Sequence, residues 1–258
     1  MSGLAGELSL GLALADLADA ITLPAFEARA FSVSRKADKS EVTEIDRDTE
    51  ASIVERLVAD RPDHAVFGEE HGTSGSSASP WRWVIDPIDG TSNFVRGVPV
   101  WATLIALTHV DRGPVVGVVS APALGRRWWA SSDEGAFANG HPIRVADTSS
   151  IADAQVSITF NAGWDRLGLT SRLVELQQQS YRARGYGDFW QHMLVAEGAI
   201  DVAIDAIGLA PYDIAAVQAV VEAAGGRLTD RTGVRTFEND SAVSTNGRLH
   251  DEVISRLC

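Results

Sequence analysis

The stretch Trp83-Val84-Ile85-Asp86-Pro87-Ile88-Asp89-Gly90-Thr91 indicates both the fold class of this chain and the kind of site it carries. An apolar strand ends here in two aspartates, at the sheet edge where open α/β sheets bind ligands. Pro87 fixes φ and turns the chain, so we expect Asp86 and Asp89 to face one point. Converging carboxylates repel each other unless a cation lies between them, and Gly90 and Thr91 offer backbone N–H groups to an anion. The stretch therefore indicates metal-assisted phosphate chemistry.

Composition limits the classes of partner. With 258 residues, of which 45% are hydrophobic and 22% charged, the chain can bury a large core. Its formal net charge of −13 argues against nucleic acid and anionic membrane as partners. Apolar runs such as 98–107 are too short to span a membrane, and the single cysteine, Cys258, excludes a thiol metal cluster. We therefore expect a cytoplasmic protein that holds an anion with bound cations and backbone amides.

Apolar periodicity and turn residues divide the chain into two lobes. Residues 1–148 predict helices over 4–20 and from Thr43 onward, a surface loop over 73–79, and several antiparallel hairpins, so this lobe is α+β. Residues 149–258 alternate strands with helices, which predicts an α/β lobe. The helices expected in this second lobe cover 170–179, 189–197, 214–224 and 250–257.

Oxygen ligands dominate the candidate metal site. Glu69 also ends an apolar strand, so it is expected beside Asp86, and carboxylates with a carbonyl suit Mg²⁺. The histidine spacing gives no zinc pattern, and the aspartate run does not fit a calcium loop. Asp213 precedes an apolar helix, and Asp46 follows Thr43 in a capping pattern. For these two aspartates, plain helix capping is the alternative to a functional role.

Four motifs in this order resemble the inositol monophosphatase family of magnesium-dependent, lithium-sensitive phosphatases. The resemblance covers essentially the whole chain, and it implies a layered αβαβα fold with the active site between the lobes of a homodimer. The motifs are Val42-Thr43-Glu44-Ile45-Asp46, Gly68-Glu69-Glu70, Asp86-Pro87-Ile88-Asp89-Gly90-Thr91, and Tyr212-Asp213-Ile214-Ala215-Ala216 with Glu222-Ala223-Ala224-Gly225-Gly226.

The resemblance also implies roles for individual residues. Gly90 and Thr91 would donate N–H groups to the phosphate. Thr91 and Asp46, together with Glu69, would orient and help deprotonate the attacking water. The ligands of two or three Mg²⁺ ions would be Glu69, Asp86, the Ile88 carbonyl, Asp89 and Asp213, with Asp46 contributing to the metal site. Residues 1–148 would therefore carry most of the metal ligands, and residues 149–258 would carry the last one together with the substrate-facing residues.

Within the family, the chain is most similar to the histidinol-phosphate phosphatases of actinobacteria. The segments that carry this similarity are 93–101, 120–129, 186–188 and 194–201. A substrate with an ammonium group and an imidazole calls for extra carboxylates, for which Asp188, Glu197 and Asp205 are candidates beside Asp89. Ala206 stands where family members carry an inositol-binding glutamate, and Asp205 is its candidate replacement.

Three other functions stay open. Inositol-1-monophosphatase activity requires binding of a neutral polyol, and Ala206 counts against it. A fructose-1,6-bisphosphatase or a 3′(2′),5′-bisphosphate nucleotidase requires basic residues for a second phosphate. The candidates are Arg96, Arg126, Arg127, Arg182 and Arg184. An inactive metal-binding regulator is the non-enzymatic alternative, and retention of Asp46 and Thr91 counts against it.

Overall fold

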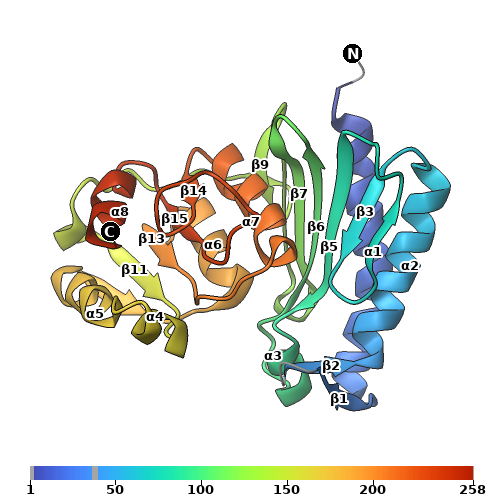
Figure 1. Cartoon of the computed structure of the whole chain (residues 1–258), viewed down its shortest axis with the longest axis horizontal. Helices are drawn as coiled ribbons and strands as arrows, with labels where there is room; N and C mark the ends of the chain where they lie inside the picture. The colour runs from blue at the N-terminus through green and yellow to red at the C-terminus, as the bar shows by residue number, and fades with distance from the viewer. Residues whose placement is uncertain (1–2, 37–39, 258) are drawn as a thin grey trace.

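Helices and β-sheets alternate in layers along the long axis of the molecule (Figure 1). The computed structural model describes residues 3–36 and 40–257, so residues 1–2, 37–39 and Cys258 lie outside the described residues. Helices α1 and α2 pack on one face of an eight-stranded sheet, and α6 and α7 lie between that sheet and a five-stranded one. Helices α5 and α8 cover the outer face of the second sheet. This αβαβα arrangement confirms the predicted fold class.

The eight-stranded sheet has the order β10-β9-β8-β7-β6-β5-β3-β4, and its pairs are antiparallel except for β3 with β5. A separate hairpin, β1-β2, leads into α2. The elements up to β10 are α1 (Ala5–Ala28), β1 (Val33–Arg35), β2 (Glu41–Thr43), α2 (Glu44–Asp60), β3 (Ala65–Gly68), β4 (Gly72–Gly75), β5 (Trp81–Asp89), α3 (Thr91–Arg96), β6 (Ala102–His109), β7 (Gly113–Ala121), η1 (Pro122–Leu124), β8 (Arg126–Ser131), β9 (Gly135–Ala138) and β10 (His141–Pro142).

The five-stranded sheet has the order β12-β11-β13-β15-β14, with parallel pairs around β11 and antiparallel pairs around β15. The predicted lobe boundary at 148–149 lies between β10 and β11. The remaining elements are η2 (Ile151–Asp153), β11 (Gln155–Ile158), α4 (Ala162–Arg166), α5 (Thr170–Gln179), β12 (Arg182–Arg184), α6 (Asp188–Ala196), β13 (Val202–Ile204), α7 (Pro211–Ala223), β14 (Arg227–Thr229), β15 (Val243–Thr245) and α8 (His250–Leu257).

The central core joins the two lobes. Apolar residues on one face of the large sheet, such as Leu104 and Val119, pack against Phe189 of α6 and Ile214 and Val217 of α7, and all of them are buried. The other face of the sheet packs on α1 and α2. Since α6 and α7 bury residues against the first sheet, the carboxyl end of β5 is held against the first turns of both helices.

Helix α1 is longer than predicted, because its apolar pattern continues past residue 20 to Ala28. By length and composition alone it could span a membrane, a test that core helices also pass. In the structure, Leu8, Leu14 and Ala18 of α1 are buried in the core that it shares with β7. That the protein has no membrane partner and that it is cytoplasmic stay predictions.

Two other details of the sequence analysis are wrong. The segment 73–79 is not entirely a surface loop, because β4 pairs antiparallel with β3. Its Ser/Gly composition reflects an edge strand with no apolar core face. Asp213 is not directly before its helix, since α7 begins at Pro211, a residue suited to the first helical position. Asp213 is the third residue of α7, and its carboxylate accepts a hydrogen bond from Ala210 N–H at 2.6 Å.

Candidate active site

Three carboxylates from two elements converge at the junction of the layers. Oxygen atoms of Asp86 and Asp89, at the end of β5, and of Asp213, in the first turn of α7, all lie within 4.8 Å of one another. Asp89 also accepts a hydrogen bond from Phe189 N–H at 2.8 Å, which ties β5 to α6. The structure therefore brings together two motifs that are more than 120 residues apart in the sequence.

A β-bulge explains how two aspartates three residues apart reach one side of a strand. Asp86 pairs with Leu104 of β6, whereas Asp89 pairs with Ala102, so β5 has one extra residue over this interval. In a regular strand, side chains three positions apart point to opposite faces. The Ile88 N–H donates to Asp86 Oδ1 at 2.9 Å and stabilises the bulged backbone.

The electrostatics of this cluster are unfavourable without a cation. Burial, followed by the charges of Glu69, Asp89 and Asp213, raises the pKa of Asp86 well above its ordinary value. Burial and the charge of Asp188 do the same to the pKa of Asp89. Burial is also the main cause that raises the pKa of Asp213 to about 7. Since carboxylates resist ionising together, the site favours a species of positive charge.

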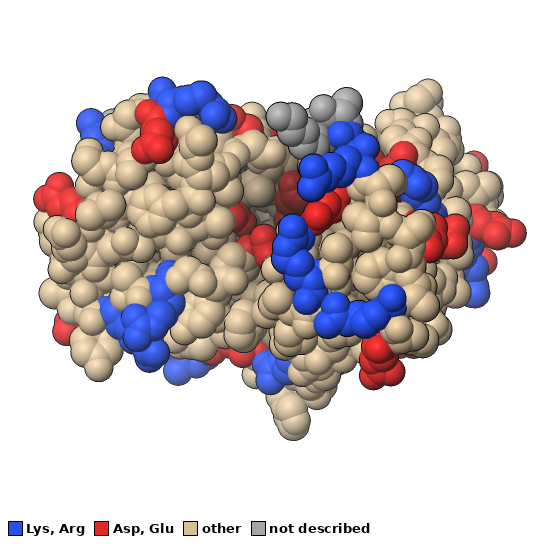
Figure 2. All heavy atoms as spheres, turned by 90° about the horizontal axis from the view of Figure 1, so that it is seen from below, with Lys and Arg blue, Asp and Glu red and all other residues tan. Residues whose placement is uncertain are grey.

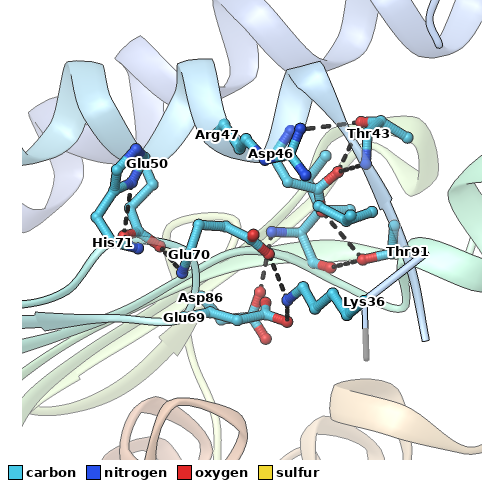
Figure 3. Close-up of polar contacts among 12 residues, drawn as sticks. Lys36, Thr43, Asp46, Arg47, Glu50, Glu69, Glu70, His71, Asp86 and Thr91 are labelled. Atoms are coloured by element: carbon cyan, nitrogen blue, oxygen red, sulfur yellow. Dashed lines mark hydrogen bonds and ion pairs between the residues drawn. The ribbon is translucent and has the colours of Figure 1, made fainter. Parts of the chain in front are cut away.

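Glu69 lies beside Asp86 and reaches a lysine. Its backbone N–H donates to the Ile85 carbonyl at 3.2 Å, and its carboxyl group interacts with that of Asp86. Lys36 Nζ lies 2.7 Å from Glu69 Oε1 and 2.6 Å from Glu70 Oε1, so its ammonium supplies positive charge at this edge (Figure 3). Burial raises the pKa of Glu69, and the bond from Lys36 opposes that change. Lys36 was not among the predicted site residues, because its contact with Glu69 joins residues 33 positions apart and no local pattern indicates it.

Asp46 and Thr91 form a second polar group next to the cluster. Thr91 Oγ1 lies 3.0 Å from Asp46 Oδ1 and 2.9 Å from the Ile88 carbonyl oxygen, and its single proton serves one of them at a time. Asp46 Oδ2 accepts hydrogen bonds from both the N–H and the hydroxyl of Thr43, so the predicted capping pattern is present. Burial raises the pKa of Asp46. Capping uses one oxygen of Asp46, and the other faces Thr91.

A cavity of about 410 Å³ opens beside Glu69 and the first turn of α3, and residues 90–92 line it. Gly90 has φ of 83° and precedes the helix, whose first N–H groups have no partner within the helix. Arg35 and Arg96 also line the cavity. Figure 2 shows acidic side chains in the hollow between the two halves of the molecule and basic side chains beside it.

Asp188 and Asp205 lie on the α6 side of the cluster. Asp188 begins α6 with φ of 48°, and its Oδ2 accepts a hydrogen bond from Asn93 Nδ2 at 3.0 Å. Burial and the charge of Asp205 raise the pKa of Asp188 to about 6. Asp205 Oδ2 lies 3.1 Å from His192 Nε2. Both carboxylates act electrostatically on Asp89, which places them near the metal candidates.

Glu197 has different surroundings. It follows the last residue of α6, at the end opposite Asp188, so about 13 Å of helix separates them. Its carboxylate forms an ion pair with Arg126 and accepts a hydrogen bond from Trp128 Nε1. The structure does not bring Glu197 into the carboxylate cluster, and its substrate-binding role stays a prediction.

Most of the basic residues named for a second phosphate do not line this cavity. Arg126 pairs with Glu197, Arg127 pairs with Asp16 and Asp19, and Arg182 and Arg184 lie on β12. Arg96 alone among these five lines the cavity, where its guanidinium pairs with Glu41 at 2.5 Å.

The donor set fits Mg²⁺. Carboxylate oxygens from Asp86, Asp89 and Asp213, the nearby carboxylate of Glu69 and the Ile88 carbonyl are hard oxygen donors of the kind that Mg²⁺ prefers. Burial, together with repulsion between the carboxylates, raises the pKa values of the three aspartates, and a bound cation would oppose both effects. Among the described residues, no histidine or cysteine belongs to this cluster, which argues against zinc.

Comparisons with known proteins find relatives over nearly the whole chain. A family model described as "Inositol monophosphatase family" matches residues 9–258. A histidinol-phosphatase of Mycobacterium tuberculosis is 47% identical over 256 residues, covering 97% of each chain. A histidinol-phosphatase of Streptomyces coelicolor is 44% identical over 259 residues, covering 97% of this chain and 96% of the relative. The crystal structure of the extragenic suppressor protein suhB from Bartonella henselae superposes with a TM-score of 0.89 at 25% identity and covers 98% of each chain.

Proposed function

Since this chain belongs to the inositol monophosphatase family, we propose that it is a Mg²⁺-dependent phosphomonoesterase that hydrolyses L-histidinol phosphate to L-histidinol and phosphate. The observation that carries the proposal is the convergence of Asp86, Asp89 and Asp213 within 4.8 Å, close to Thr91 and Asp46. This arrangement combines a place for divalent cations with a polar pair that can handle the proton of a nucleophilic water.

We assign the metal-ligand role to Glu69, Asp86, Asp89 and Asp213 with the Ile88 carbonyl, and Asp46 adjoins them. When bound, Mg²⁺ neutralises phosphoryl charge and lowers the pKa of water. Gly90 and Thr91 present the N–H groups at the start of α3 to the phosphate oxygens.

Thr91 and Asp46 provide the proton handling. When Thr91 Oγ1 donates to Asp46 Oδ1, its lone pairs can accept a hydrogen bond from a water and so orient that water toward phosphorus. The raised pKa of Asp46 makes its carboxylate a better proton acceptor than an ordinary aspartate. In the reaction the water oxygen bonds to phosphorus, the ester P–O bond breaks, and the leaving oxygen takes a proton.

The substrate assignment is supported by the charge on the α6 side. Histidinol phosphate carries an ammonium group and an imidazole, and Asp188 and Asp205 offer carboxylates near Asp89. The names of the relatives from M. tuberculosis and S. coelicolor point to the same substrate. Arg35 and Arg96 at the cavity keep a bisphosphate substrate as the second candidate, because two guanidinium groups suit an additional phosphate.

Phosphate release from four esters tests the assignment: histidinol phosphate, inositol 1-phosphate, fructose 1,6-bisphosphate and adenosine 3′,5′-bisphosphate, each with Mg²⁺. We expect the highest kcat/KM for histidinol phosphate. A preference for a bisphosphate would overturn the substrate while leaving the chemistry intact. Absence of turnover with every ester would favour the metal-binding regulator.

Three further properties are proposed on the family resemblance. They are two or three Mg²⁺ ions per site, a homodimer and a cytoplasmic location. Calorimetric titration with Mg²⁺ measures the first, and sedimentation analysis measures the second.

A further inference from the structure

Glu50 is a buried carboxylate that the proposed reaction does not use. It lies on α2 one turn after Asp46, and its exposed fraction is 0%. Its oxygens accept hydrogen bonds from Glu70 N–H at 2.8 Å and from His71 N–H at 2.7 Å, and Oε1 lies 3.0 Å from His71 Nδ1 (Figure 3). A buried carboxylate is costly unless such donors surround it. All of these donors belong to the turn that directly follows Glu69.

Gly68 permits this close approach. A Cβ atom added to Gly68 would lie 2.2 Å from Glu50 Oε1 and 2.3 Å from its carboxyl carbon, which no real contact allows. The backbone on both sides of Glu69 is therefore packed directly against the Glu50 carboxylate.

Glu69 is thus held at both of its peptide groups. Its own N–H donates to the Ile85 carbonyl of β5 at 3.2 Å, and the next N–H, that of Glu70, donates to Glu50. Two fixed peptide planes restrict φ and ψ of the residue between them. This restriction directs the Glu69 side chain toward Asp86, with which its carboxyl group interacts.

We propose that Glu50 is a positioning residue for Glu69: it holds the turn Glu69–His71 so that the Glu69 carboxylate is presented to the metal cluster. The inference rests on the proposed function, in which Glu69 is a metal ligand. Partners that orient ligands typically change metal affinity 10–100-fold when they are replaced.

Glu50→Gln tests the role. The amide keeps the size of the side chain but replaces one acceptor oxygen with an NH₂ group, which faces N–H donors instead of accepting from them. We expect the Mg²⁺ dissociation constant from isothermal titration calorimetry to rise about 10–100-fold. In turnover assays, the half-saturating Mg²⁺ concentration rises, and kcat at saturating Mg²⁺ recovers to within about threefold of wild type.

Asp230→Asn is the matched control. Asp230 is also a buried carboxylate that accepts backbone hydrogen bonds from a turn, at 2.8 Å from Thr232 N–H and 2.9 Å from Val234 N–H, but it belongs to the second lobe. We expect this variant to lose thermal stability and to bind Mg²⁺ like wild type. If Glu50 has a purely structural role, Glu50→Gln should likewise lose thermal stability and bind Mg²⁺ like wild type.

Gly68→Ala provides a second perturbation from the opposite side, because its Cβ must displace Glu50. Weaker Mg²⁺ binding in whichever of the two variants folds, with Asp230→Asn unchanged, supports the role. Wild-type Mg²⁺ affinity in a folded Glu50→Gln or Gly68→Ala protein would overturn it. The parallel variant Glu69→Gln separates the two proposals. If Glu69→Gln binds Mg²⁺ like wild type, the assignment of Glu69 as a metal ligand is wrong as well. If Glu69→Gln binds Mg²⁺ weakly, the ligand assignment holds and the Glu50 variants test only the role of Glu50.

Discussion

Replacing Asp213 by asparagine is predicted to stabilise the metal-free protein at pH 8 while it removes a metal ligand. Burial is the main cause that raises the pKa of this carboxyl group from 3.8 to about 7, and the charge of Glu69 adds to it. An amide has nearly the same shape and no charge. Its oxygen can still accept the hydrogen bond that Ala210 N–H donates to the first turn of α7.

The sign and size follow from linkage between protonation and folding. Because the folded-state pKa is the higher one, the stability that the protonated group contributes is fully present below about pH 4 and is lost as the pH rises to about 7. At 1.36 kcal/mol per pKa unit, the difference between 3.8 and about 7 corresponds to about 4 kcal/mol. Asp213→Asn should therefore match wild type to within about 1 kcal/mol at pH 4 and exceed it by about 4 kcal/mol at pH 8.

Urea unfolding in EDTA at pH 4, 6 and 8 measures this difference. Asp230→Asn serves as a control of opposite sign. Burial raises the pKa of Asp230, but hydrogen bonds from Thr232, Val234 and Asn239 outweigh burial, so the pKa is lowered. Replacing Asp230 should therefore cost stability above pH 4. Saturating Mg²⁺ should stabilise wild type and leave Asp213→Asn almost unaffected. If Asp213→Asn were no more stable than wild type at pH 8 in EDTA, the electrostatic reasoning would be refuted.

Four further predictions concern the proposed reaction. Asp89→Asn should lower kcat more than about 10³-fold without a lower melting temperature in EDTA; substantial residual phosphate release would contradict the ligand role. Thr91→Ala should lower kcat about 10²-fold, and Thr91→Ser should restore most of it, since the hydroxyl is what matters. EDTA should abolish turnover, and Mg²⁺ at 100 times its dissociation constant should stabilise the protein by about 2.7 kcal/mol in thermal unfolding. Asp188→Asn should lower kcat/KM for histidinol phosphate about 10–100-fold at pH 8 and much less at pH 5, because the pKa of Asp188 is about 6; an equal loss at both pH values would count against a contact with the substrate cation.

Local signals predicted several elements well. The Thr43–Asp46 capping pattern predicted the start of α2, and the helix predicted over 250–257 matches α8. Helix α5 begins and ends where its apolar spacing predicts. These features depend on residues close together in the sequence, so the local sequence is enough to predict them.

Tertiary contacts explain the features that were missed. The polar strand β4 exists because β3 offers it a pairing edge, which composition cannot reveal. The ion pair between Glu197 and Arg126 was not predicted, because Arg126 lies 71 residues earlier in the chain and reaches Glu197 only in the folded state. For Glu50 a signal was available, since it lies one helical turn from Asp46 and shares its buried face. The helical spacing of Asp46 and Glu50 does not show which residues their shared face contacts.

The extra residue in β5 makes the metal cluster depend on strand length rather than on residue identity alone. Deleting Ile88 would return β5 to the register of β6 and leave the two aspartates two positions apart, still on one face of the strand. The deletion would remove the carbonyl that Thr91 contacts, which we propose as a metal ligand, and the N–H group that donates to Asp86 Oδ1. A chain with all of its acidic residues intact could thus lose its site by a single deletion, so alignments that score only the aspartates would fail to recognise an inactive relative.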